Sequence, residues 1–191
     1  ILLKKRKKIF LEDTKYFVED IRKDVIKKFG YDKVYKQGFN IKTPINLKLQ
    51  NFATKSLRKG LESYDKRKGW RGPVAKKNIN NNWKKGLDKF KLEKSIGWDL
   101  AIVKKISKFS STIETDKDKK GEINYNSISW TKKNFDKLLE VGDVVYVKKI
   151  KDKSYELKQL PKVNGGIVVM DPFTGRVYAL SGGFSFKKSE F

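Results

Sequence analysis

The sequence predicts an α+β protein in which a small five-stranded β-barrel is inserted between an N-terminal strand-helix segment and a C-terminal β-hairpin. Two amphipathic helical patterns in the first third of the chain, five short β-rich runs after Trp98 and two apolar runs about a turn near the end support this fold class. With 191 residues, of which 38% are hydrophobic, the chain can form one large or two small domains.

The first helix is predicted in "LEDTKYFVEDIRKDVIKKFG". Asp13 or Thr14 is the expected N-cap, and Gly30 is expected to end the helix. Its apolar positions recur at helical spacing and are expected to face a core: Phe17, Ile21 and Val25.

A short strand is expected next, in "GFNIKTPI", and a second helix should begin after Asn46 as its N-cap. The spacings of three and four between apolar residues predict one buried stripe on this helix. The stripe consists of Leu49, Phe52, Ala53, Leu57, Leu61 and Tyr64.

The predicted strands of the barrel are "WDLAIVKKI", "SSTIETD", "EINYNSISW", "GDVVYVKKI" and "SYELKQL". A helical pattern, "TKKNFDKLLEVG", lies between the third and the fourth, with Thr131 as the expected cap. Five short strands with one helix in that place follow the element order of an OB-like barrel.

The closing hairpin is predicted around "DPFTG", where Asp171 suits the first turn position, Pro172 the second, and Gly175 closes the turn. The flanking runs, Ile167–Met170 and Val177–Leu180, are apolar at nearly every position, which is typical of strands buried on both faces. The helices at the front of the chain would cover one face only. Because the sequence also starts at Ile1 rather than Met, we expect it to be part of a longer protein.

The composition excludes some chemistry and leaves the meaning of the charge open. The absence of Cys and His excludes zinc binding of the usual kind and catalysis by Cys or His. The net charge of +24 rests on 46 Lys and Arg, of which only six are Arg, whereas recognition of phosphates and bases favours Arg. A compositional bias, a nucleic acid, and another anionic polymer or surface all remain as explanations. No apolar stretch approaches the roughly 18–20 residues that span a bilayer.

Three local patterns suggest sites that the rest of the sequence does not support. "DKDKKGE" begins like a calcium loop but lacks the glutamate at position twelve, so a hairpin tip is expected. Ser-x-x-Lys occurs at Ser56, Ser63, Ser129 and Ser185 without the accompanying Ser-x-Asn and Lys-Thr-Gly motifs, so no nucleophile is assigned. Several aromatic residues could stack on single-stranded nucleic acid but are expected in the core or collar of the barrel: Trp70, Trp83, Trp98, Trp130, Tyr125 and Tyr146.

Two long stretches resemble class A penicillin-binding proteins. "GGIVVMDPFTGRVYALSGGFSFKKSEF" resembles the opening hairpin of their transpeptidase domain, and "GFNIKTPINLKLQNFATKSLRKGLESYDKRKGWRGP" resembles the segment that leads into their OB-like insertion. The family's helix usually opens with Asp-Pro, where this chain has Asn46-Leu47, and Pro44 replaces a strand Thr. The structural motif residues of the two stretches are Trp70, Arg71, Gly72, Pro73, Asp171, Pro172, Gly175, Gly182 and Gly183.

The resemblance implies a division of the chain. Residues 1–33 would be a helical linker after a glycosyltransferase domain, and residues 70–161 the OB-like domain. Residues 34–67, as strand and helix, and residues 163–191, as the opening hairpin, would be two parts of a truncated transpeptidase domain.

The resemblance also implies a function for the parent protein, a bifunctional peptidoglycan synthase with glycosyltransferase and serine D,D-transpeptidase domains at the periplasmic face of the bacterial inner membrane. The chain itself is expected to be non-catalytic and to need no cofactor or metal. Its expected partners are the rest of the parent polypeptide, and protein regulators or peptidoglycan. No nucleic acid is expected, although an OB-fold module for single-stranded nucleic acid is the alternative. Membrane contact would come only through an N-terminal anchor outside this sequence.

Overall fold

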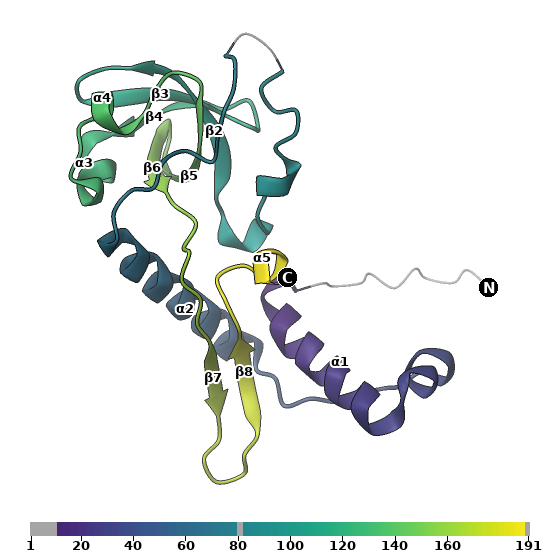
Figure 1. Ribbon diagram of the computed structural model, residues 1–191. Helices are drawn as coiled ribbons and strands as arrows, with labels where there is room; N and C mark the ends of the chain where they lie inside the picture. Colours follow the sequence, from purple (N-terminus) through teal and green to yellow (C-terminus); the bar gives the residue numbers. More distant parts are fainter. Residues whose placement is uncertain (1–10, 80–81, 190–191) are drawn as a thin grey trace. The chain divides into compact units, whose positions relative to one another are not determined.

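The computed structural model describes residues 11–79 and 82–189 (Figure 1). Residues 1–10 of the predicted helical linker and the last two residues of the predicted hairpin region lie outside this part. The chain forms two compact units, one made of the chain up to Leu57 and again from Gly165, the other of Arg58–Asn164.

Five strands of the second unit close into a barrel. They are β2 (Asp99–Ile106), β3 (Ser110–Thr115), β4 (Lys120–Asn124), β5 (Asp143–Lys151) and β6 (Ser154–Lys158). Neighbours pair in the order β5-β2-β3-β4-β6, and β6 pairs again with β5, which closes the sheet. Only the pairing of β4 with β6 is parallel, while a short strand β1 (Ala75–Lys76) adds to β5. This is the topology of an OB-like barrel, so the predicted α+β fold and barrel are confirmed.

The barrel is filled by side chains that alternate along the strands. In β3 and β4 every second residue is buried, as a strand with one face on a core requires. Two short helices between β4 and β5, α3 (Tyr125–Ile128) and α4 (Phe135–Leu138), add further apolar side chains to this core. The core consists of Ala101, Val103, Ile113, Ile123, Ile128, Phe135, Leu138, Leu139, Val145, Val147, Tyr155 and Leu157.

Gly121 in β4 lies where another strand approaches closely. A Cβ atom at this position would be 2.7 Å from the carbonyl oxygen of Lys153 and would also meet the ring of Tyr155. We therefore expect Gly121→Ala to lower the free energy of unfolding by about 1–3 kcal/mol, the usual cost of overpacking. The matched control is Gly60→Ala, since nothing lies within 4 Å of that helical glycine, and it should raise stability by about 0.5–1 kcal/mol. Urea unfolding followed by tryptophan fluorescence measures both, and equal effects of the two variants would contradict the prediction.

Two details of the predicted barrel are wrong. The third strand ends at Asn124, and Tyr125–Ile128 is helical. Thr131 does not cap a helix, because it lies in a 3-10 turn, η5 (Ser129–Thr131), and its hydroxyl donates to the carbonyl of Ile128 at 2.7 Å. Asn134 occupies the N-cap position of α4 instead.

The segment between Pro73 and β2 is irregular. It contains only β1 and two 3-10 turns among the residues described, η3 (Asp88–Phe90) and η4 (Lys94–Ile96). Even so, Trp83 and Leu87 from this segment are buried.

The first unit combines helices with one hairpin. It holds η1 (Glu12–Thr14), α1 (Lys15–Phe29), the π-helical turn η2 (Lys33–Gln37), the beginning of α2 (Leu47–Arg67), β7 (Ile167–Met170), β8 (Val177–Ser181) and α5 (Phe186–Ser189). Gly30 ends α1 with φ of 82°, as predicted. Thr14 stands at the N-cap, but its hydroxyl donates to the carbonyl of Leu11 and caps no helix amide; the alternative cap, Asp13, lies in η1.

Helix α2 begins as predicted, and its buried face is shifted from the predicted stripe, which keeps Ala53 and Leu61. The Asn46 side-chain oxygen accepts hydrogen bonds from the amides of Lys48 and Leu49 at 3.0 and 3.1 Å, so the predicted N-cap is confirmed. Phe52 and Tyr64 of the predicted stripe are 57% and 43% exposed. Three buried positions of the helix are polar: Gln50, Thr54 and Asp65.

The predicted strand in "GFNIKTPI" is absent, since residues 38–46 form neither strand nor helix. Pro44 has no amide hydrogen to donate to a sheet. The amide of Asn46 does donate to the carbonyl of Tyr178 in β8 at 2.9 Å, a single backbone hydrogen bond rather than a strand ladder.

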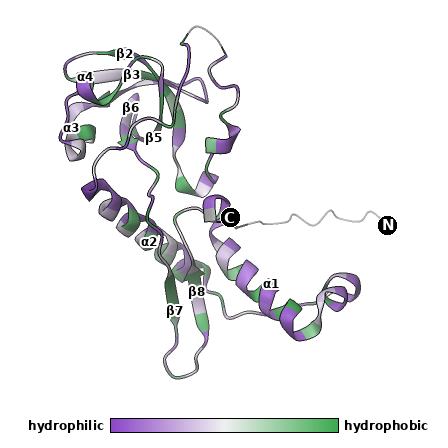
Figure 2. Cartoon of the chain, viewed as in Figure 1, coloured by the Kyte–Doolittle hydropathy of each residue, from purple (hydrophilic) through white to green (hydrophobic). Residues whose placement is uncertain are grey.

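The hairpin β7–β8 has one buried and one exposed face. Figure 2 shows that β7 is hydrophobic throughout. On the exposed side, Val168 and Met170 are each 53% accessible, whereas Ala179 and Ser181 of β8 are buried. The sequence predicts strands that need cover on both faces, of which this chain covers only one, and the exposed Val168 and Met170 agree with that prediction.

Within the described ranges, none of the helices combines the length and the apolar character that crossing a bilayer requires.

Candidate functional site

The motif "YDKRKGWRGP" forms a hydrogen-bonded centre at the end of α2. The carboxylate of Asp65, a residue only 2% exposed, accepts two parallel hydrogen bonds from the Arg71 guanidinium at 2.8 and 2.9 Å. It also accepts hydrogen bonds from the Gln159 side chain at 2.8 Å and from the amide of Lys162 at 3.1 Å. Arg71 precedes the barrel strands and Gln159 and Lys162 follow them, so one carboxylate holds both the entrance and the exit of the barrel.

Hydrogen bonds stabilise the negative charge of the Asp65 carboxylate. Burial by itself raises the pKa of Asp65, but the hydrogen bonds from Arg71, Gln159 and the Lys162 amide outweigh that cost and lower the pKa below its usual value. The carboxylate is therefore ionised at neutral pH. Bidentate arginine–carboxylate geometry of this kind adds directional specificity to the attraction.

A second ionic chain connects α2 to β6. Lys158, whose side chain is 8% exposed, bonds Glu62 at 2.8 Å and Glu156 at 3.1 Å, and Glu156 bonds Lys66 at 2.9 Å. Burial raises the pKa of Glu156, but the hydrogen bond from Lys66 and the attraction of Lys158 outweigh it, so the net pKa is lowered. The end of α2 is thus fixed to the barrel by alternating charges.

The other residues of this motif shape the entrance. Trp70 packs edge-to-face on Trp130 with ring centroids 6.0 Å apart, and both rings lie against the barrel core. Gly72 has φ of 98°, which glycine tolerates best, and Pro73 follows it directly before Val74 joins β5 through the Val144 carbonyl. We name the set Asp65, Arg71, Gln159 and Lys162 the neck cluster.

The second motif makes the hairpin turn. Asp171 Oδ1 accepts hydrogen bonds from the amides of Phe173 and Thr174 at 2.8 and 3.1 Å, which lowers the pKa of Asp171. Pro172 lies within the turn, and Gly175, at φ of 68°, returns a hydrogen bond from its amide to the Asp171 carbonyl. These residues shape the backbone of the turn.

After β8 the chain passes the glycine pair Gly182–Gly183 close to α1. A Cβ atom on Gly182 would lie 3.0 Å from the ring of Tyr16. The two motifs belong to separate units.

Gln50 of α2 forms a second buried hydrogen-bonded group. The sequence did not reveal it, because a polar residue outside the expected apolar stripe was not expected to be buried. Its side-chain oxygen accepts from the amide of Leu180 at 2.9 Å, and its side-chain nitrogen donates to the Leu180 carbonyl at 2.9 Å. The same nitrogen donates to the carbonyl of Asp13 at 2.9 Å. The primary amide thereby replaces a neighbouring strand at the edge of β8.

We expect Gln50→Ala to destabilise the hairpin by about 1–3 kcal/mol, since it leaves buried backbone groups of Leu180 without partners. Hydrogen exchange at the Leu180 amide should accelerate strongly, because that amide bonds the side chain that is removed. Gln50→Glu is the informative second variant, because it keeps the acceptor and loses the donor. Unchanged exchange at Leu180 in Gln50→Ala would contradict the assignment.

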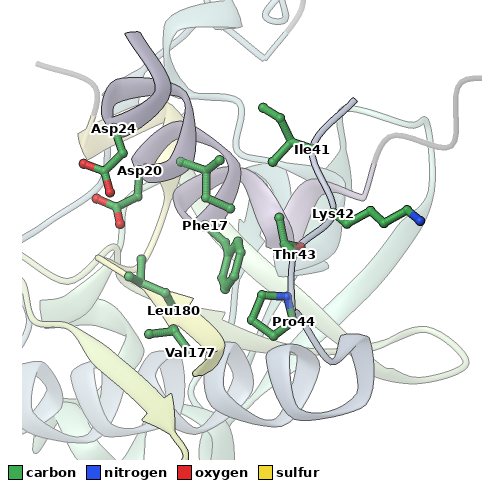
Figure 3. Close-up of a pocket in the computed structure, with 10 residues that line it drawn as sticks. Phe17, Asp20, Asp24, Ile41, Lys42, Thr43, Pro44, Val177 and Leu180 are labelled. Atoms are coloured by element: carbon green, nitrogen blue, oxygen red, sulfur yellow. The ribbon is translucent and has the colours of Figure 1, made fainter. Parts of the chain in front are cut away.

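A groove of about 340 Å³ opens in the first unit between α1, the segment before α2 and β8 (Figure 3). Phe17, Pro44, Val177 and Leu180 form its apolar wall, and the carboxylates of Asp20 and Asp24 lie together on one side.

Metal-binding geometry is not found among residues 11–79 and 82–189. That part of the chain holds no group of three acidic, His or Cys side chains able to bind a metal ion. The sequence resembling a calcium loop forms the β3–β4 hairpin tip, with Asp118 in the left-handed region at φ of 59°.

The aromatic residues considered for stacking are mostly inside the barrel unit. Trp83, Trp98 and Tyr146 are 5%, 9% and 3% exposed. Tyr125, at 44% exposed, is the most accessible of the set. Three of the six side chains are therefore largely shielded from solvent.

Comparison with known proteins identifies relatives of both units. Residues 70–163 match the family described as the penicillin-binding protein OB-like domain. Penicillin-binding protein 1A of Rickettsia bellii is 36% identical over 196 aligned residues, which cover 100% of this chain and 24% of that protein. The Escherichia coli protein of the same name is 28% identical and covers 92% of this chain and 22% of its own length.

A solved structure agrees. The crystal structure of penicillin-binding protein 1A from Haemophilus influenzae superposes with a TM-score of 0.77 at 27% identity, covering 92% of this chain and 27% of that one. The chain thus spans about a quarter of the length of the curated relatives it matches.

Proposed function

Because this chain belongs to the penicillin-binding protein 1A family, we propose that it is the non-catalytic spacer region of a bifunctional peptidoglycan synthase. The parent would polymerise glycan strands with a glycosyltransferase domain and crosslink peptides with a serine D,D-transpeptidase domain. It would work at the periplasmic face of the bacterial inner membrane, and any anchor would lie outside the residues given. Residues 34–67 and 163–191 would contribute to the transpeptidase domain, and residues 70–161 would form the inserted OB-like domain.

The observation that carries the spacer role is the neck cluster. Asp65 bonds residues on both sides of the barrel, and the chain Glu62–Lys158–Glu156–Lys66 repeats the attachment. A module held at both of its ends to one helix is suited to standing between other domains and presenting a surface to partners. The partners we propose are protein regulators or peptidoglycan itself, together with the rest of the parent polypeptide.

The absence of catalysis by this chain is part of the proposal. Of the four Ser-x-x-Lys serines, Ser185 is buried at 2% exposure, and the companion motifs are missing from the sequence. Incubation with a fluorescent penicillin should leave the chain unlabelled. A covalent adduct would overturn this part of the proposal, and Ser185 would be the first residue to replace.

Docking is tested against the nucleic-acid alternative. We expect the chain to co-sediment with isolated peptidoglycan at physiological salt, above the level of a basic protein of unrelated fold and similar net charge. Fluorescence anisotropy with single-stranded oligonucleotides should show weak binding at low salt that vanishes at physiological salt, as lysine-driven attraction does. Micromolar oligonucleotide binding that survives physiological salt would favour the OB-fold nucleic-acid module instead.

A further inference from the structure

A cavity of about 490 Å³ lies in the barrel unit where β2 begins. The loop between Lys91 and Gly97, the first residues of β2, the β3–β4 turn and Tyr146 of β5 line it. Its size falls within the range of about 300–1,000 Å³ that holds small-molecule ligands. Neither the neck cluster nor the hairpin turn contributes a residue to this cavity.

The aromatic side of the cavity is rigid. Trp98 and Tyr146 lie with ring centroids 6.0 Å apart, and the Tyr146 hydroxyl donates to the carbonyl of Phe90 at 2.6 Å. Burial raises the pKa of Tyr146 to about 12, so this hydroxyl stays protonated and keeps its hydrogen bond. The cavity is therefore formed before any ligand enters.

Asp116, a residue that lines the cavity, has a carboxylate oxygen without a hydrogen-bond donor among the described residues. Asp116 Oδ1 is buried and accepts no hydrogen bond from any residue that the structure describes. Its backbone is fixed, because its amide donates to the Leu100 carbonyl at 2.8 Å. Buried polar atoms in native proteins nearly always have a partner. The Asp116 carboxylate, which lines the cavity, therefore has hydrogen-bonding capacity that no described residue meets.

Of the three lysines that line the cavity, two form ion pairs with aspartates. Lys117 pairs with Asp99, and Lys91 pairs with Asp88 at 2.8 Å. Lys94, on the rim of the cavity, forms no ion pair with any residue in the described ranges. The cavity thus offers a carboxylate site around Asp116 and Asp99 and a separate ammonium at Lys94.

We propose that this cavity binds a short peptide or amino acid that carries both a free ammonium and a free carboxylate. The ligand's ammonium would donate to Asp116, its carboxylate would accept from Lys94, and its apolar part would pack on Trp98. A neutral sugar would supply donors to Asp116 but would leave the charge of Lys94 unused. This inference stands apart from the spacer role, and either can fail alone.

Trialanine is the probe, with N-acetyl-trialanine lacking the ammonium and trialanine amide lacking the carboxylate. Titrated into the 15N-labelled chain, trialanine should shift the amide signals of Gly97, Leu100 and Lys117 saturably. Each blocked peptide should bind about tenfold more weakly, the usual loss for one charge-assisted hydrogen bond. Shifts that do not saturate, or equal binding of the three peptides, would overturn the proposal.

Two variants assign the ends of the ligand. Asp116→Asn should weaken trialanine about tenfold yet leave N-acetyl-trialanine unaffected, and Lys94→Gln should weaken trialanine yet leave trialanine amide unaffected. Asp152→Asn, in the β5–β6 turn with a side chain 88% exposed, is the control and should change nothing. The spectrum of each variant reports its folding, so a loss of affinity in a folded variant is unambiguous. Unchanged trialanine affinity in Asp116→Asn would disprove the ammonium site.

Discussion

Replacing Asp65 by alanine should lower the free energy of unfolding of the barrel unit by about 3–5 kcal/mol, the range for removing one partner of a buried ion pair. The change leaves the Arg71 guanidinium, whose side chain is only 26% exposed, without its carboxylate. It also removes one of the two acceptors of the Gln159 side chain and the acceptor of the Lys162 amide. The bonds of Asp65 to the chain before the barrel strands and to the chain after them are lost together. We therefore expect the effect to exceed that of a surface ion pair.

The measurement is urea unfolding followed by tryptophan fluorescence. All four tryptophans lie between Trp70 and Trp130, so the signal reports the barrel unit. Asp152→Ala is the control, because its carboxylate is 88% exposed and should matter by no more than about 0.5 kcal/mol. A loss below about 1 kcal/mol in Asp65→Ala would mean that the neck cluster contributes no more than a surface ion pair.

The same residue predicts a pH dependence. The pKa of Asp65 is lower in the folded chain than in the unfolded chain, so its stabilisation is present above the unfolded value of about 3.9. That stabilisation is lost as the pH falls through the folded pKa. Between pH 5 and 2, unfolding free energy should therefore fall more steeply for the natural chain than for Asp65→Asn. Parallel curves for the two proteins would contradict the assigned pKa direction.

The barrel could be predicted from the sequence because each strand has a recognisable local sequence pattern. The run that becomes β5, "GDVVYVKKI", is bounded by glycine and charge, and "SSTIETD" alternates in the way a half-buried strand does. The order of these runs along the chain then limits the topology to few choices.

The errors arose where tertiary contacts decide the outcome. The segment at Pro44 has the composition of a strand, but a single backbone hydrogen bond, from the Asn46 amide, joins it to β8 in place of a ladder. Helix α2 was expected to bury Phe52 and Tyr64, yet the structure buries Gln50 and Asp65, whose partners lie more than ninety residues further along the chain at Leu180 and Gln159. No local period reveals such partners. The ion pair of Asp65 could have been suspected, since Asp65 and Arg71 occur in the same motif, on which the resemblance rests.

The barrel core gives the second large effect: Phe135→Ala should destabilise the barrel unit by about 3–5 kcal/mol, the usual cost of truncating a buried phenylalanine. Phe135 is 0% exposed and packs with the core residues of the strands, whereas its helix α4 has only four residues and cannot persist without that contact. Phe109→Ala is the matched control, because Phe109 is 66% exposed at the β2–β3 turn and should change stability by less than about 0.5 kcal/mol. Phe135→Leu should fall between the two, since it retains most of the apolar volume. Urea midpoints followed by tryptophan fluorescence rank the three variants. An equal loss of stability in Phe109→Ala and Phe135→Ala would contradict the assignment of Phe135 to the barrel core.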